Sequence, residues 1–141
     1  MGNKLKYKLD TIHLVSDHIK DLTNNYTIFL FEGDLGSGKT TLIKQILKDL
    51  GISKHVKSPT FSLVNEYVEN DLTIFHFDLY RINKENELDN IGFYEYLDSG
   101  KLCFIEWPMI AIQNIYKDYI LIKISITGDS EREIEIIKSE R

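Results

Sequence analysis

The segment GDLGSGKT at positions 33–40 decides how the chain is interpreted, because it fits the pattern G-x-x-x-x-G-K-[ST] of a phosphate-binding loop. Glycines at 33, 36 and 38 allow the backbone to curl around an anion without clashes from Cβ atoms. The loop N–H groups and the N-terminus of the next helix then point at the phosphates. We expect Lys39 to bind the β- and γ-phosphates and Thr40 to offer its hydroxyl to Mg²⁺.

The segments on either side of the loop have the structure that the motif requires. The apolar run Thr27–Phe31 is typical of a central strand buried on both faces. Residues 39–50 have helical periodicity, and Gly51 follows as a stop signal. The apolar stripe of this helix consists of Leu42, Ile43, Ile46, Leu47 and Leu50. The predicted order is therefore strand, loop and helix, as in known phosphate-binding loops.

The rest of the chain mixes strand and helix patterns. Further strands are predicted at Lys4–Leu9, Phe61–Val68, Leu72–Leu79, Lys101–Glu106, 120–126 and 133–136. Helices are predicted after Asp10 or Thr11, over short stretches of 83–98 and from Pro108. Turns at 70–71 and 128–130 predict two hairpins. We expect an α/β protein whose single domain covers residues 1–141, a P-loop NTPase with a mixed parallel and antiparallel sheet flanked by helices.

Composition narrows the function classes. The chain has 141 residues, a formal net charge of −5 and a pI near 5.3. We therefore do not expect it to bind nucleic acid through extensive contacts with the phosphate backbone. The single cysteine, Cys103, cannot form an internal disulfide and is expected to be a packed thiol. The sequence has no apolar run of membrane-spanning length and no secretory signal pattern at its start. We therefore expect a cytoplasmic protein without a membrane association.

Two carboxylates are candidates for metal and water chemistry, because hydrolysis needs more than a phosphate loop. Glu106 ends an apolar strand, where an acid would organise Mg²⁺ or activate water. Asp78 ends another strand, and period-2 alternation places His76 on the same face. The plainer alternatives are a strand-end cap for Asp78 and a helix-start carboxylate for Glu106.

Two further positions are candidates for contact with the nucleotide. Thr60, in the Ser-Pro-Thr-Phe segment after the loop helix, would reach Mg²⁺ or the γ-phosphate if this segment behaves as an ordered switch. A simple turn is the alternative, because Ser-Pro is a turn signal. Trp107, next to Glu106, belongs either to the core or to a lid over the nucleotide.

Four blocks in this order resemble the TsaE (YjeE) family, the small bacterial ATPases of tRNA threonylcarbamoyladenosine synthesis. They are GDLGSGKTT at 33–41, SPTFSLVNEY at 58–67, HFDLYR at 76–81 and IEW at 105–107. The likeness covers nearly the whole chain. Ser37 stands where the family commonly has Ala, Met109 where a polar residue is usual, and Ser62 where Thr is frequent. None of these departures changes a proposed role.

The resemblance implies an ATP-binding and ATP-hydrolysing subunit that acts with the TsaD–TsaB pair in modifying adenosine 37 of tRNA, and that meets tRNA only through this complex. It implies ATP or ADP and Mg²⁺ as ligands. The implied catalytic residues are Lys39, Asp78 and Glu106. The implied metal-side residues are Thr40, Asp78 and Glu106. The implied nucleotide-binding residues are Gly33, Asp34, Leu35, Gly36, Ser37, Gly38, Lys39, Thr40, Thr41, Thr60 and Trp107.

Three alternatives remain open at the level of sequence. A small-molecule or nucleotide kinase usually carries several arginines that close over phosphates, whereas Arg81 is the only arginine before position 132. A GTPase would need an Asn-Lys-x-Asp segment, and the nearest string, Asn83 to Asn86, lacks the final Asp. A nucleotide-binding adaptor would bind ATP without turnover.

Overall fold

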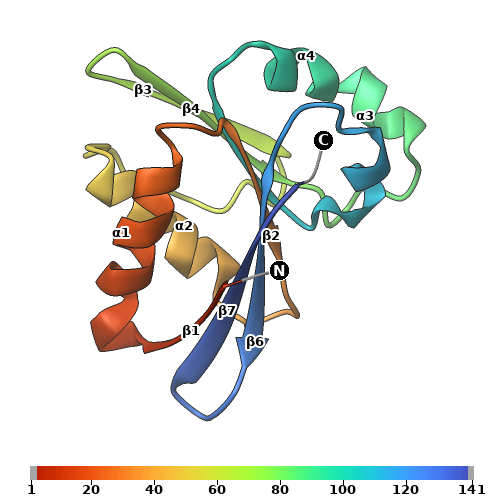
Figure 1. Cartoon of the computed structure of the whole chain (residues 1–141). Coiled ribbons are helices and arrows are strands. Elements are labelled where there is room, and N and C mark those ends of the chain that lie inside the picture. The colour runs from red at the N-terminus through yellow and green to blue at the C-terminus, as the bar shows by residue number, and fades with distance from the viewer. Residues whose placement is uncertain (1–2, 140–141) are drawn as a thin grey trace.

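The computed structural model describes residues 3–139, which form one seven-stranded sheet with helices on both faces (Figure 1). The strands are β1 (Asn3–Lys8), β2 (Ile28–Glu32), β3 (Val64–Glu69), β4 (Leu72–Asp78), β5 (Leu102–Glu106), β6 (Ile120–Ile126) and β7 (Glu131–Lys138). The helices are α1 (Ile12–Leu22), α2 (Lys39–Asp49), α3 (Asn86–Asn90) and α4 (Phe93–Asp98). Short 3₁₀ turns are η1 (Leu9–Thr11), η2 (Pro108–Ile110) and η3 (Ile112–Asn114).

The sheet has the strand order β1-β7-β6-β2-β5-β4-β3 and mixes both pairing directions, as predicted. Strand β2 lies in the middle and pairs in parallel with β5 and β6, and β4 pairs in parallel with β5. The β1–β7, β6–β7 and β3–β4 pairs are antiparallel. The carboxyl ends of β2, β4, β5 and β6 therefore meet at one edge of the sheet, where ligands of open α/β sheets bind.

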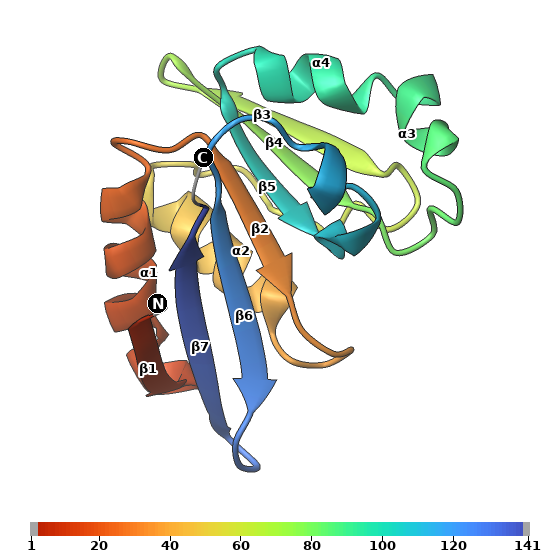
Figure 2. The same cartoon turned by 45° about the vertical axis from the view of Figure 1, so that its right-hand side comes forward.

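Helices lie on opposite faces of the sheet (Figure 2), and an apolar core fills the space beneath them on each face. Helices α1 and α2 cover one face, where their apolar stripes pack on residues such as Phe31, Phe104 and Ile122. Helices α3 and α4 and the turns η2 and η3 cover the other face, over Leu30, Phe77 and their neighbours. Strand β2 is buried on both faces from Ile28 to Phe31, which explains its continuous apolar run.

Three local predictions are wrong in detail. The predicted strand Phe61–Val68 begins only at Val64, because the backbone turns before it and Leu63 has a positive φ of 68°. Pro108 begins a single 3₁₀ turn rather than a longer helix. Thr11 precedes α1 as expected, but its hydroxyl bonds the backbone of Lys8 instead of capping the helix.

Candidate phosphate-binding site

The loop between β2 and α2 has the backbone geometry that its glycines predict. Gly36 and Gly38 have φ values of 78° and 101°, a region that favours glycine, and Gly38 is the N-cap of α2. Asp34 is exposed, so its carboxylate lies away from the interior of the loop as expected. Ser37 is buried. The loop thus presents the N-terminus of an eleven-residue helix toward the edge of the sheet.

Lys39 is held in the loop by backbone oxygens. Its Nζ donates to the carbonyl of Gly33 and, at 3.1 Å, to that of Asp34, and only 5% of the residue is exposed. The ammonium also lies 4.0 Å from the centre of the Trp107 ring, a cation–π contact. Burial lowers the pKa of Lys39, while the charges of Glu106, Asp78 and Asp34 oppose that shift. The cation is therefore fixed where a phosphate would need it.

Glu106 contacts the loop directly. The hydroxyl of Thr40 donates toward both oxygens of Glu106, at 2.8 and 3.0 Å. The parallel pairing of β2 and β5 sets Glu106 opposite Phe31, just before the loop, and this register brings the two side chains together. A strand-end acid beside the loop Thr is the arrangement that holds Mg²⁺ in phosphate-loop proteins.

His76 completes this contact, although its place in the site was not predicted from the sequence. Its Nε2 lies 2.7 Å from Oε2 of Glu106, and the ring is fully buried. Its Nδ1 has no hydrogen-bond partner among the described residues. Since His76 lies on β4 two residues before Asp78, the predicted shared face was the only available signal.

Asp78 lies at the same edge, one strand further from the loop. It is paired in register with Glu106 across β4 and β5, and it is 6% exposed. Burial raises the pKa of Asp78, opposed by a hydrogen bond from the backbone N–H of Tyr80 at 2.9 Å, and the nearby charge of Glu106 raises it further. Both predicted carboxylates therefore lie at the carboxyl ends of neighbouring strands, in register with each other.

Trp107 follows Glu106 in a left-handed conformation, with φ and ψ both 56°. Its half-buried ring lies between the Lys39 ammonium and the Tyr80 ring, whose centre is 4.8 Å away. The ring also packs against the core beneath α3 and α4, so its predicted role as a lid over the nucleotide stays a prediction.

Thr60 does not join these groups. Its hydroxyl lies 2.9 Å from that of Ser58, and no hydrogen bond within residues 3–139 links it to Lys39, Thr40 or Glu106. The neighbouring Phe61 is 82% exposed and carries the guanidinium of Arg81 at 4.3 Å from its ring centre. The predicted contact of Thr60 with a nucleotide therefore stays a prediction.

The oxygens available to a metal fit Mg²⁺ in part. Within the described part of the chain, no three His, Cys, Asp or Glu side chains gather as a metal site. Thr40, Glu106 and Asp78 supply a hydroxyl and carboxylates, the hard oxygen ligands that Mg²⁺ takes. Mg²⁺ usually keeps waters and adds substrate phosphates, so an incomplete set of protein ligands suits it.

A cavity of about 340 Å³ adjoins the loop, and Glu106 is not among the residues that line it. It is lined by the loop, by the start of α2, by the β1–α1 connection and by the β6–β7 turn. The lining residues are Tyr7, Leu9, Ile12, Gly36, Ser37, Gly38, Thr41, Asp129, Ser130 and Arg132. Thr41 and the glycines thus connect the phosphate loop with a space large enough for part of a ligand.

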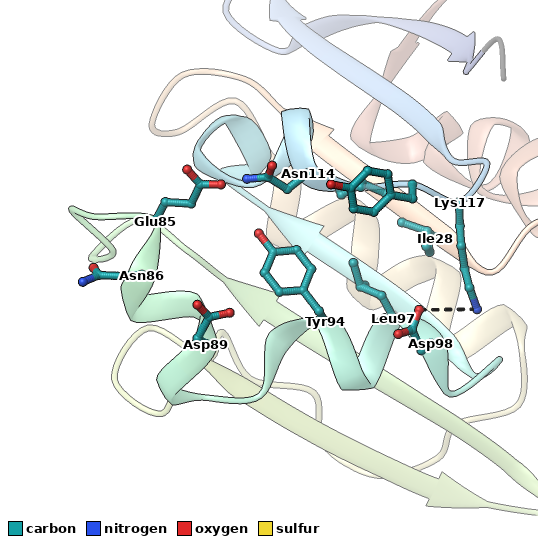
Figure 3. Close-up of a pocket in the computed structure, with 11 residues that line it drawn as sticks. Ile28, Glu85, Asn86, Asp89, Tyr94, Leu97, Asp98, Asn114 and Lys117 are labelled. Carbon is teal, nitrogen blue, oxygen red and sulfur yellow. Dashed lines mark ion pairs between the residues drawn. The ribbon is translucent and has the colours of Figure 1, made fainter.

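A cavity of about 530 Å³ lies elsewhere, between α3, α4 and the segment after η3 (Figure 3). Glu85, Asp89 and Asp98 line it, and Lys117 pairs with Asp98 at 3.9 Å. Because its acidic lining opposes phosphate and none of the loop residues borders it, the candidate site remains at the loop.

Two other predictions concern single features. Cys103 is fully buried in β5, and burial raises the pKa of its thiol to about 12, so it is a packed thiol as expected. Within residues 3–139, none of the helices has the length and apolar character needed to cross a bilayer.

Comparison with known proteins adds independent findings. The family model "Threonylcarbamoyl adenosine biosynthesis protein TsaE" matches residues 6–134. The TsaE protein of Bacillus subtilis is 38% identical over 107 residues, which are 76% of this chain and 66% of that protein. The TsaE protein of Haemophilus influenzae is 38% identical over 115 residues, 82% of this chain and 72% of that protein. A crystal structure of Bacillus subtilis YdiB aligns with a TM-score of 0.71 at 29% identity, covering 96% of this chain and 86% of that one.

The mixed sheet with a glycine-rich loop between its central strand and α2 defines an α/β protein of the phosphate-loop class. Within that class the family match spans most of the chain. The chain belongs to the TsaE family, which confirms the resemblance and the predicted α/β fold.

Proposed function

We propose that this chain binds Mg²⁺-ATP at the loop 33–40 and hydrolyses it to ADP and phosphate in the synthesis of threonylcarbamoyladenosine at adenosine 37 of tRNA. Its relatives are named for threonylcarbamoyladenosine biosynthesis, which supports this pathway. The observation that carries the chemistry is the convergence of Lys39, Thr40 and Glu106 at the start of α2. A glycine-rich turn that merely caps a helix has no need for a buried lysine and a buried acid beside it.

Each group has a role that follows from its position. Lys39 would exchange its contacts with the loop carbonyls for the β- and γ-phosphates. Thr40 and Glu106 would hold Mg²⁺, which when bound neutralises charge on the phosphates. His76 holds the Glu106 carboxylate toward Thr40. Asp78, one strand further out, is then the group to position the attacking water.

We propose a place for the nucleoside on the other side of the loop. Since the contact between Thr40 and Glu106 marks the metal and γ-phosphate side, adenine and ribose would leave toward β6 and β7. The cavity of about 340 Å³ lies there and borders Gly38 and Thr41. We propose that it accepts the adenosine, with Ile12 and Tyr7 as apolar wall.

The proposed partners are a TsaD–TsaB pair, with turnover slow in the isolated chain and faster in the complex. Net charge of −5 agrees with indirect contact with tRNA. An isolated chain that binds tRNA tightly at physiological salt would contradict this part of the proposal.

The test is ATP turnover by the chain with and without purified TsaD and TsaB, together with direct measurement of ATP affinity. Lys39→Ala should abolish nucleotide binding, because the phosphates lose their fixed cation. Glu106→Ala should keep binding and lose turnover. Lys44→Ala is the matched control, since Lys44 lies exposed on the same helix. Unchanged ATP affinity in Lys39→Ala would refute the site.

The second candidate, a small-molecule or nucleotide kinase, is tested in the same assay. Transfer of the γ-phosphate to small acceptors faster than to water would favour a kinase. A GTPase is tested by competition of GTP against ATP. Turnover that stays at background with both partner proteins present would favour an adaptor that binds nucleotide without hydrolysis.

A further inference from the structure

Arg132 lies on β7, the last strand in sequence, and contacts Ser37 of the phosphate loop, 95 residues earlier in the chain. Its Nε donates to the carbonyl of Ser37 at 3.0 Å and one terminal nitrogen to that of Gly36 at 3.4 Å. The other terminal nitrogen donates to the carbonyls of Gly128 at 3.3 Å and Glu131 at 3.0 Å, within the β6–β7 hairpin. One guanidinium therefore ties the terminal hairpin to the loop.

These contacts fix the direction of a loop amide. In a planar trans peptide the C=O and the following N–H point in opposite directions. When Arg132 holds the Ser37 carbonyl outward, the N–H of Gly38 must point away from Arg132. The N–H of Ser37 is already used by the carbonyl of Asp34, at 3.0 Å. The contact with Arg132 thus selects one orientation of the Gly38 peptide.

Only arginine suits this position. Its planar fork carries five N–H donors, and here all three nitrogens bond backbone oxygens at four different residues. A lysine ammonium in its place would keep the charge but could not span the loop and the hairpin in one plane. Glycine at 36 and 38 leaves the loop backbone conformationally free, so contacts from Arg132 outside the loop can restrict it to one conformation.

We propose that Arg132 is a positioning residue for the phosphate loop, holding the Ser37–Gly38 peptide in the orientation that presents the Gly38 N–H to an anion. This inference rests on the proposed function, because the anion is the phosphate chain of the nucleotide. Arg132 acts through the loop and not through the nucleoside. Fixing the loop before the ligand arrives avoids part of the ordering cost of binding.

The first test uses the backbone amide signals of the free protein, which need no ligand. In Arg132→Gln, the Gly38 N–H resonance should shift and broaden, because its peptide can now reorient. Ile134→Val is the matched control, since Ile134 is fully buried on the same strand and, within residues 3–139, its apolar side chain makes no hydrogen bond to the loop. A Gly38 resonance in Arg132→Gln that keeps the position and width of the wild type would overturn the inference.

The second test separates the loop from the nucleoside cavity, which Arg132 also borders. Binding of ADP and of inorganic pyrophosphate is measured by calorimetry for the wild type, Arg132→Gln, Arg132→Lys and Ile134→Val. Both Arg132 variants should lose about tenfold in affinity, by the same factor for both ligands, since the loop must then be ordered on binding and a cost of about 1.4 kcal/mol is a tenfold loss. Ile134→Val should bind both ligands as the wild type does.

Each other outcome decides against the proposal in a different way. Loss of ADP affinity with normal pyrophosphate affinity would mean that Arg132 touches the nucleoside. Full affinity in Arg132→Lys would mean that charge alone matters. If Arg132→Gln does not fold, Arg132→Lys serves both tests. Wild-type protein that binds neither ligand would refute the proposed function, whereas normal binding by every variant would refute only the role of Arg132.

Discussion

Gly33, the first residue of the loop, passes so close to β6 that a side chain has no room. A Cβ atom there would lie 2.8 Å from the carbonyl oxygen of Ile124 and 2.6 Å from the Ser37 hydroxyl. The first neighbour is backbone of a central strand and cannot move aside. The glycine pattern of the motif therefore has a packing reason at this position as well as a conformational one.

Gly33→Ala should lower the free energy of unfolding by about 1–3 kcal/mol, as overpacking does, and should weaken ADP binding because the loop must shift. Urea unfolding and calorimetry measure the two effects. Gly128→Ala is the control, since its Cβ would meet only the Glu131 Cβ at an ordinary 3.6 Å. Stability of Gly33→Ala equal to that of Gly128→Ala would contradict the close approach.

Cys103 gives a prediction with a defined pH range. Burial raises the pKa of its thiol to about 12, so the folded thiol stays protonated where the unfolded one, with a pKa near 9, ionises. Its contribution to stability is complete below pH 9 and is lost as the pH rises toward 12, by about 1.4 kcal/mol for each pH unit.

The measurement is the difference in unfolding free energy between the wild type and Cys103→Ala. We expect this difference to stay constant from pH 7 to 8.5 and to shrink between pH 9 and 10.5. Thiol reagents should react with Cys103 only after unfolding, since the side chain is fully buried. Rapid labelling of the native protein would be the contrary result.

At the scale of elements, the β3–β4 hairpin turns on two residues with positive φ, Asn70 at 53° and Asp71 at 67°. Positive φ at both central positions is the type I′ turn, which matches the twist of the strands and is best formed by Asn-Gly. Asp tolerates this region at some cost, whereas a β-branched residue does not.

Asp71→Gly should therefore raise the free energy of unfolding by a few tenths to about 1 kcal/mol, with glycine's higher unfolded entropy limiting the gain. Asp71→Val, at the same exposed position, should lower it by about 1 kcal/mol or more. Thermal unfolding ranks the three proteins. A valine variant as stable as the wild type would show that the turn has another conformation.

Local patterns in the sequence predicted most of these elements, because burial periodicity and turn residues are local properties. The central strand, α1, α2 and the two hairpins lie where their patterns indicate. The predicted start of β3 was wrong, because the turn before this strand is held in part by another strand: the Leu63 carbonyl accepts from the backbone N–H of Asp78, at the end of β4. A single window of sequence does not contain such a pairing.

The same distinction holds for the candidate site. The loop, Glu106 and Asp78 were predictable because strand ends and motifs mark them. The partners that hold them were not: His76 meets Glu106 over 30 residues, and Arg132 meets Ser37 over 95. Whether Thr60 joins the site is equally a question of tertiary packing, and here it bonds Ser58 instead.

For the whole molecule, the loop connects both halves of the sheet. On one side of β2, strands β4 and β5 supply the acids Asp78 and Glu106. On the other side of β2, the Ile124 carbonyl of β6 lies beside Gly33, and Arg132 of β7 bonds the Ser37 carbonyl. The two cores also meet back to back at β2. A ligand bound at the loop would contact groups from both halves, so its binding should stabilise the protein as one unit.

We expect a 100-fold excess of ADP over its Kd to raise the free energy of unfolding by about 2.7 kcal/mol, which is mass action on the folded state. For a chain of this length that corresponds to a rise in Tm of roughly 8–12 °C. Trp107 fluorescence reports the region of the site and far-ultraviolet circular dichroism the whole sheet, and the two transitions should move together. Lys39→Ala should show no rise and Lys44→Ala the full one. An equal rise in Lys39→Ala would place the nucleotide away from the loop, and a rise seen by one probe alone would mean that the two halves of the sheet unfold separately.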